Sequence, residues 1–130
     1  MNNRIFHPIG QGAFYSEKLN GLNIVYDCGS TSPKYGKKIV TNAYKTSDVI
    51  DILFISHFDN DHISLIPSLI NSVSKIKVVV LPFLHDEEKK ILANFYRIFG
   101  LDFYKIITEP NSFFGEDTKI IEINNNEESS

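Results

Sequence analysis

A group of polar residues directly after an apolar run constrains this chain more than any other feature. Residues 52–55 are bulky and apolar, and this pattern predicts a buried strand. Four side chains that can bind a metal ion follow at once: His57, Asp59, Asp61 and His62. A loop that leaves a strand can bring several such side chains into one small volume, at the sheet edge where open α/β proteins bind ligands.

The residue types in this group suit a divalent cation. Imidazole and carboxylate are donors that zinc accepts, and carboxylate also suits manganese. A catalytic metal keeps one position open for water, whose pKa it lowers towards roughly 7. In the alternative interpretation Asp59, Asn60 or Asp61 caps a following helix and the histidines are exposed. A serine hydrolase built from Ser56 and His57 is disfavoured, because adjacent strand residues point to opposite faces. The gathering of four ligands at a strand end favours the metal site.

Residues 56–66 resemble the signature loop of the metallo-β-lactamase-fold hydrolases, whose usual pattern is His-x-His-x-Asp-His. Asp59 stands where the second histidine is expected. The form His-x-Asp-x-Asp-His is similar to the subgroup that includes the hydrolase domain of the bacterial competence protein ComEC. The resemblance implies an αββα sandwich that holds one or two divalent metals between two sheets. It assigns His57 and Asp59 to the first metal. It assigns Asp61 and His62 to the second, with Asp61 also the catalytic residue that orients the nucleophilic water.

Two further stretches carry the resemblance. Residues 9–13, Ile-Gly-Gln-Gly-Ala, are similar to the opening of that subgroup. Taken alone they predict a tight turn rather than a phosphate loop, since no Gly-Lys-Ser/Thr follows. An Asp-x-Gly at Asp27 implies hydrogen bonds that fix the signature loop, although an ordinary strand end with an Asx-type turn stays open. The chain departs from the family at Ser64 and Leu65, where a Gly-Gly pair is common. This change alters how closely the next helix approaches the site.

The remaining pattern predicts an α/β (α+β) chain that forms the N-terminal half of a metallo-β-lactamase-like αββα sandwich. We expect a domain over residues 1–124, a polar tail over 125–130, and a loop over 31–47 with a short strand at 37–41. Apolar spacing predicts one amphipathic helix over 63–73 and another over 86–99. The expected strands are 4–8, 13–15, 22–26, 75–81, 103–107 and 119–123, with a hairpin turn at Asn20-Gly21. The second helix is expected to bury Ile91, Leu92, Phe95, Ile98 and Phe99.

Composition excludes some classes of protein. The chain has 130 residues with 42% hydrophobic content and a net charge of −3, which predicts one globular domain without strong general attraction to nucleic acid. Cys28 is the one cysteine, so no internal disulfide can form. No apolar stretch approaches the ~18 residues of a membrane helix. We expect a cytoplasmic protein that does not contact membranes. The oligomeric state is not predicted.

The resembled family also takes a histidine, an aspartate and a final histidine from later in the chain. After His62 the sequence contains only His85, which is expected to be a surface residue before a helix. We therefore expect the chain to cover about the first half of such a domain. In the intact protein we expect a metal-dependent hydrolase acting through a metal-bound hydroxide, on a small-molecule or nucleic-acid phosphodiester ahead of a thioester or lactam. Asp59 favours manganese, with zinc open. The alternative is a non-catalytic binding or regulatory module.

Overall fold

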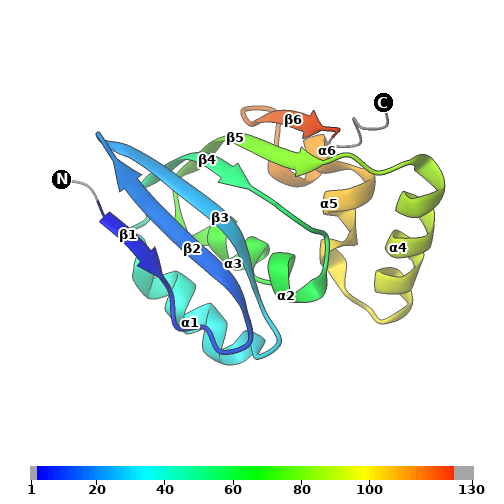
Figure 1. Cartoon of the computed structure of the whole chain (residues 1–130), viewed down its shortest axis with the longest axis horizontal. Coiled ribbons are helices and arrows are strands. Elements are labelled where there is room, and N and C mark those ends of the chain that lie inside the picture. The colour runs from blue at the N-terminus through cyan, green and yellow to red at the C-terminus, as the bar shows by residue number, and fades with distance from the viewer. Residues whose placement is uncertain (1–2, 125–130) are drawn as a thin grey trace.

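A six-stranded sheet runs through residues 3–124, the part of the chain that this computed structural model describes (Figure 1). Its strand order follows the sequence, and the strands are β1 (Asn3–Phe6), β2 (Gly12–Leu19), β3 (Leu22–Ser30), β4 (Val49–Phe54), β5 (Lys75–Pro82) and β6 (Lys119–Ile123). The first three pair antiparallel, and β3 to β6 pair parallel. Asn20 and Gly21 both have positive φ and form the predicted hairpin turn between β2 and β3.

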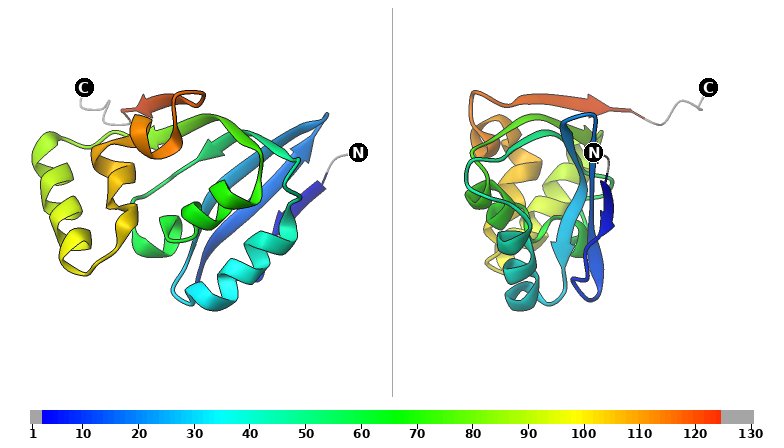
Figure 2. Two further views of the ribbon diagram at one scale, coloured as in Figure 1. Left: turned by 180° about the vertical axis from the view of Figure 1, so that it is seen from behind. Right: turned by 90° about the vertical axis from the view of Figure 1, so that its left-hand side faces the viewer.

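Helices cover one face of this sheet (Figure 2). They are α1 (Pro33–Ala43), α2 (Asn60–Ile63), α3 (Ile66–Ser72), α4 (Asp86–Ile98), the 3₁₀ helix η1 (Asp102–Tyr104), α5 (Lys105–Thr108) and α6 (Pro110–Phe114). One sheet with helices on one face corresponds to half of an αββα sandwich, and the predicted fold class is confirmed. None of the helices formed by residues 3–124 has the length and apolar character needed to cross a bilayer.

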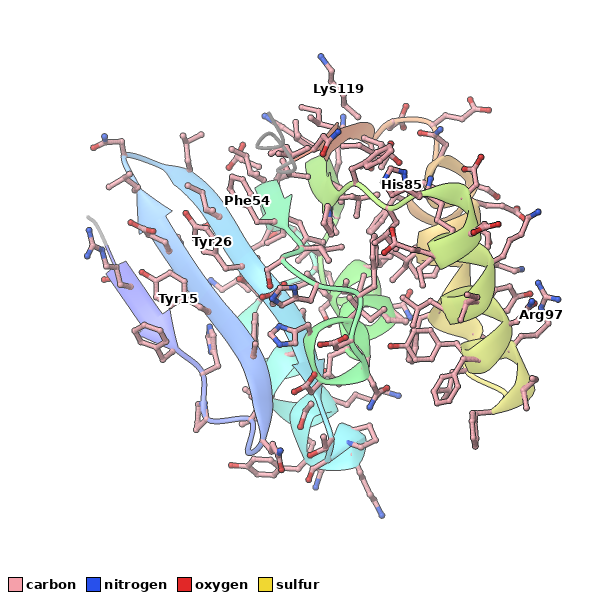
Figure 3. The ribbon with its side chains drawn as sticks, turned by 45° about the vertical axis from the view of Figure 1, so that its right-hand side comes forward. Tyr15, Tyr26, Phe54, His85, Arg97 and Lys119 are labelled. Atoms are coloured by element: carbon pink, nitrogen blue, oxygen red, sulfur yellow. The ribbon has the colours of Figure 1, made fainter. Side chains whose placement is uncertain are left out.

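The two faces of the sheet differ in what they contact. Val25, Leu53 and Val79 are register partners on neighbouring strands, and all three are fully buried in the core. Side chains that alternate with them form a row of aromatic contacts across the other face: Phe6, Tyr15, Tyr26 and Phe54. The last three are labelled in Figure 3. The core therefore lies between the sheet and its helices, as the period-two alternation of strand residues requires.

The helix α1 replaces the predicted loop and the predicted strand at 37–41. Pro33 begins the helix, where a missing amide donor costs nothing. Gly36 and Val40 are its buried residues, and their spacing of four places them on one helix face. This periodicity is present in the sequence, but lysines between the apolar positions obscure it.

The predicted strand at 103–107 is also wrong, because these residues form η1 and α5. Phe103, Ile106 and Ile107 are buried together at helical spacing. The single helix predicted over 63–73 is shorter than expected: Ile66–Ser72 form α3, and Ile63 is instead the last residue of α2. The strands predicted at 4–8, 75–81 and 119–123 are confirmed within two residues at each end. The strands at 13–15 and 22–26 are longer than predicted.

The helix α4 has the predicted ends but not the predicted buried face. It stops before Gly100, which adopts the expected positive φ of +72°. Tyr96 and Ala93 are buried in place of the expected residues. Four of the five expected residues are instead more than half exposed: Ile91, Phe95, Ile98 and Phe99. The predicted tail at 125–130 lies outside the described residues.

Candidate metal centre

A bulge in β3 directs Asp27 towards the signature loop. Phe14 pairs with Cys28 while Tyr15 pairs with Tyr26, so Asp27 is an extra residue with no partner on β2. Its φ is +62°, a left-handed conformation that aspartate tolerates better than most residues. Bulges of this kind change the direction of a side chain, often next to a functional site. The strand continues past this point to Ser30, rather than ending near Asp27 as predicted.

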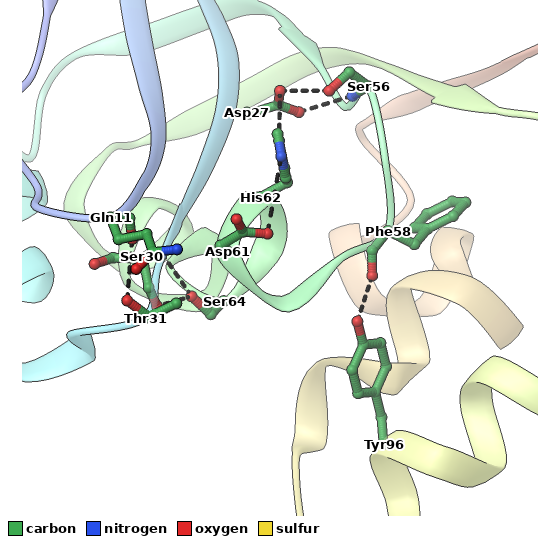
Figure 4. Close-up of polar contacts among 10 residues, drawn as sticks. All are labelled: Gln11, Asp27, Ser30, Thr31, Ser56, Phe58, Asp61, His62, Ser64 and Tyr96. Carbon is green, nitrogen blue, oxygen red and sulfur yellow. Dashed lines mark hydrogen bonds and ion pairs between the residues drawn. The ribbon is translucent and has the colours of Figure 1, made fainter.

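The buried carboxylate of Asp27 contacts two residues of the signature loop, Ser56 and His62 (Figure 4). The backbone N–H of Ser56 donates to Oδ1 at 2.7 Å, and the Ser56 hydroxyl donates to Oδ2 at 2.5 Å. The Nδ1 of His62 lies 3.1 Å from Oδ2. An imidazole held by a carboxylate through Nδ1 presents Nε2 as its free donor atom, which is the usual arrangement of a metal-binding histidine. The hydrogen bonds expected of Asp27 are therefore present.

Close backbone packing places the loop against β3. A Cβ at Gly29 would lie 2.6 Å from the backbone nitrogen of His62 and 2.6 Å from the carbonyl carbon of Asp61. A Cβ at Gly12 would overlap the carbonyl oxygen of Gly29 and lie 2.7 Å from the Cα of Ser30. The Gly-Gln-Gly turn, β3 and α2 thus stack without side chains between them. The turn has the structural role that the sequence predicted.

Ser64 and Leu65 stand where the family commonly has a Gly-Gly pair, and hydrogen bonds join both residues to β3. The Ser64 hydroxyl donates to the Ser30 carbonyl at 2.9 Å and accepts from the Ser30 amide at 2.9 Å. The Leu65 amide donates to the Cys28 carbonyl at 2.9 Å. The Leu65 side chain lies so close to Gly36 of α1 that a Cβ there would be 2.6 Å from its Cδ1. Leu65 therefore packs against a glycine on α1, and the chain between α2 and α3 still lies close to β3.

Three of the four predicted ligands are brought together. One ligand atom from each of Asp59, Asp61 and His62 lies within 4.8 Å of the others. The Nε2 of His62 is 3.8 Å from Oδ1 of Asp61. Two ligands bound at about 2.1 Å from one ion lie roughly 3 to 4 Å apart, so these two atoms already have a suitable spacing. Two carboxylates and one imidazole form a donor set that fits a divalent cation.

The capping interpretation is confirmed only in part by the geometry of α2. Asp59 occupies the N-cap position, but its side chain makes no capping hydrogen bond. His57 is exposed and is not a member of the ligand group, although its ring centroid is 5.4 Å from that of His62. The assignment of His57 and Asp59 to one metal and of Asp61 and His62 to another stays a prediction.

Two other residues of types that can bind a metal, His85 and Cys28, do not belong to the ligand group. His85 is the N-cap of α4 and takes part in a capping box with Glu88, which agrees with the surface role expected for it. Cys28 is fully buried, and burial raises the pKa of its thiol, with a further contribution from the charge of Asp27. The thiol is therefore held in its protonated form, which is a poor metal ligand.

Tyr96 of α4 also reaches the signature loop, and sequence reasoning did not identify it. Its hydroxyl donates to the Phe58 carbonyl at 2.6 Å, and both residues are buried (Figure 4). Burial raises the pKa of Tyr96 to about 12, and the charges of Asp59 and Asp61 add to this. The position of Tyr96 in α4, one residue after Phe95, gave no signal because the predicted helix face was the wrong one.

The fold and the site together define an α/β domain with a candidate divalent-metal centre where β4 ends. A family model described as the metallo-beta-lactamase superfamily matches residues 17–126, and the chain belongs to this superfamily. Members typically bind divalent metals, and membership indicates a metal-dependent hydrolase. No curated protein matches the chain.

Proposed function

We propose that this chain carries the metal centre of a phosphodiesterase of the ComEC-like type. The observation that carries the proposal is the group formed by Asp59, Asp61 and His62, with His62 oriented by a buried carboxylate. Two carboxylates in a group of three favour manganese over zinc, because manganese prefers oxygen donors. When bound, such a metal polarises a phosphoryl oxygen and lowers the pKa of water.

The residues of the chain have separable roles in this proposal. Asp27 keeps His62 in the tautomer whose Nε2 is free, because its carboxylate accepts the proton on Nδ1. Asp59 and Asp61 attract the cation and bind it, and Asp61 also orients the attacking water. The half-buried position of Asp61 and His62 limits their movement, while exposed Asp59 lies on the solvent side.

The exposure of the site supports a phosphodiester substrate. His57 and Asp59 are exposed, so an extended chain such as a nucleic-acid strand can reach the ligand group along the surface. A small lactam or thioester depends more on a closed apolar pocket for binding. A bound cation offsets the negative charge of the carboxylates, which lets an anionic substrate approach.

The first test is metal content per chain, followed by hydrolysis of bis(p-nitrophenyl) phosphate. The purified chain is saturated with manganese or zinc, desalted and measured by elemental analysis. We expect at least one ion per chain, lost in His62→Ala and in Asp61→Asn and reduced in His57→Ala. His85→Asn is the matched control, since asparagine preserves the helix cap and removes an imidazole outside the group.

The possible results separate the two candidate functions. The phosphodiesterase is supported if the unmodified chain retains metal and hydrolyses the substrate, and if Asp61→Asn loses this hydrolysis. Metal retention without hydrolysis favours a non-catalytic binding or regulatory module. Absence of bound metal in the unmodified chain contradicts the proposal for this chain.

A further inference from the structure

The segment that carries the first ligands has no regular secondary structure. Residues 55–59 lie between the end of β4 and the first residue of α2. Neither a strand ladder nor a helix therefore fixes the backbone between His57 and Asp59. The Asp59 carbonyl accepts the amides of His62 and Ile63, which joins its backbone to α2. The direction in which the chain enters Asp59 depends on separate anchors along residues 55–58.

The segment is anchored from two sides. On the sheet side, Asp27 accepts hydrogen bonds from the amide and the hydroxyl of Ser56. On the helix side, the Tyr96 hydroxyl donates to the Phe58 carbonyl, which belongs to the peptide bond that leads into Asp59. The first anchor fixes the start of the segment, and the second fixes the backbone next to a ligand.

Tyr96 is itself held rigidly. Its ring packs edge-on against buried Phe103 of η1, with ring centroids 5.1 Å apart. Its carbonyl accepts the amide of Leu101 at 3.0 Å, which closes the end of α4. A donor on a packed helix positions its acceptor more accurately than a donor on a mobile loop.

We propose that Tyr96 is a positioning residue of the metal centre, which by holding the Phe58 carbonyl sets the place of Asp59 beside Asp61 and His62. This inference rests on the proposed function. Without the hydroxyl, the buried carbonyl loses its partner and the segment gains freedom that metal binding must remove.

The test compares Tyr96→Phe with the unmodified chain in a calorimetric titration with manganese chloride. Phenylalanine keeps the ring and removes only the hydroxyl. We expect roughly three- to tenfold weaker binding, the usual consequence of losing one buried hydrogen bond. Tyr104→Phe is the control, because it removes the same atom from neighbouring η1, where the Tyr104 ring contacts Arg97. It should bind manganese like the unmodified chain.

A second measurement does not depend on the metal. The amides of His62 and Ile63 both donate to the Asp59 carbonyl, at 2.9 and 3.1 Å. In Tyr96→Phe their hydrogen exchange should become severalfold faster, while exchange in β4 and β5 stays unchanged. A merely structural role would instead speed exchange throughout the sheet and leave the affinity unchanged well below the unfolding temperature.

The outcomes can be told apart. If Tyr96→Phe binds manganese as tightly as the unmodified chain and the two amides exchange at the same rate, the positioning role is overturned. If the unmodified chain binds neither manganese nor zinc, the proposed function fails, and the exchange rates of the two amides alone decide whether Tyr96 positions the loop.

Discussion

Asp27 shows how a single residue can serve both the backbone and the site. It is the extra residue of a bulge, it has positive φ, and its carboxylate joins Ser56 to His62. We expect Asp27→Asn to weaken manganese binding about 10- to 100-fold, the range typical of partners that orient metal ligands. Asparagine adopts positive φ readily, so the bulge should remain. A metal titration measures the change.

Asp51→Asn provides the comparison for this change. The Asp51 carboxylate also accepts a backbone N–H, from Asn23 at 2.8 Å, and it lies 3.5 Å from Lys77 of β5. Asp51 lies near the start of β4, whereas the ligands follow the end of this strand. This variant should keep its metal affinity. If Asp27→Asn binds manganese as tightly as the unmodified chain, the Asp27 carboxylate does not orient His62.

The residues of the site were largely predictable, because their chemistry is local. His57, Asp59, Asp61 and His62 stand out by type and spacing, and Asp27 is recognised by the glycine two positions later. Their grouping was not predictable. The structure brings three of the four ligands together and leaves His57 at the edge, and this depends on how α2 turns after Asp59.

At the scale of elements, the contact between β3 and α2 depends on a missing side chain. A Cβ at Gly29 would meet backbone atoms of Asp61 and His62, which cannot move without displacing α2. We expect Gly29→Ala to destabilise the fold by about 1–3 kcal/mol, the usual cost of overpacking, and to weaken metal binding. Urea unfolding measures the first effect and a manganese titration measures the second.

Gly36→Ala is the matched substitution in α1. Its new Cβ would meet mainly the flexible end of the Leu65 side chain, which can adjust. Alanine is better than glycine by about 1 kcal/mol inside a helix, so the two effects should nearly cancel. If both alanine variants lose the same stability, the contact between Gly29 and α2 is not what limits the fold.

The elements that sequence analysis missed are those whose environment depends on distant residues. Strands with apolar runs and the Asn20-Gly21 turn carry local signals, and they were found. The helix α4 was predicted correctly from the residues that begin and end it, yet Tyr96 rather than Phe95 faces the core. Both faces of this helix carry large apolar side chains, so periodicity alone could not choose between them. Packing against Phe103 and the carbonyl of Phe58 decides the choice.

At the scale of the whole molecule, the partly buried Tyr44 makes stability depend on alkaline pH. Burial raises the pKa of Tyr44 from 10.0 to about 12, with a Ser16 hydrogen bond opposing this shift and the charge of Asp48 adding to it. Below pH 10 the tyrosine is protonated in both states, and its contribution is fully present. Between pH 10 and 12 the unfolded chain ionises first, so stability falls.

Urea unfolding at pH 8 and pH 11 checks this prediction. The unmodified chain should lose more stability over this interval than Tyr44→Phe does. Tyr35 is half exposed on α1, and Tyr35→Phe should behave like the unmodified chain. An equal loss in all three proteins would assign the alkaline transition to other groups.

Metal binding should also stabilise the entire domain, because elements that are distant in the sequence hold the ligand group in place. Asp59, Asp61 and His62 follow β4, while Asp27 on β3 and Tyr96 on α4 hold them in place. Unfolding removes α2 and the contacts with Asp27 and Tyr96, so the ion binds the folded state preferentially. At a metal concentration one hundred times Kd the gain is about 2.7 kcal/mol, which raises Tm by roughly 10 °C for a domain of this size.

Thermal unfolding with and without manganese measures this gain in Tm. His62→Ala should remove it, and His85→Asn should keep it, because His85 lies outside the ligand group at the start of α4. A gain of full size in His62→Ala would mean that manganese binds elsewhere. A gain that is lost in His62→Ala and reduced in Tyr96→Phe would link the metal, the loop and α4 in one cooperative unit.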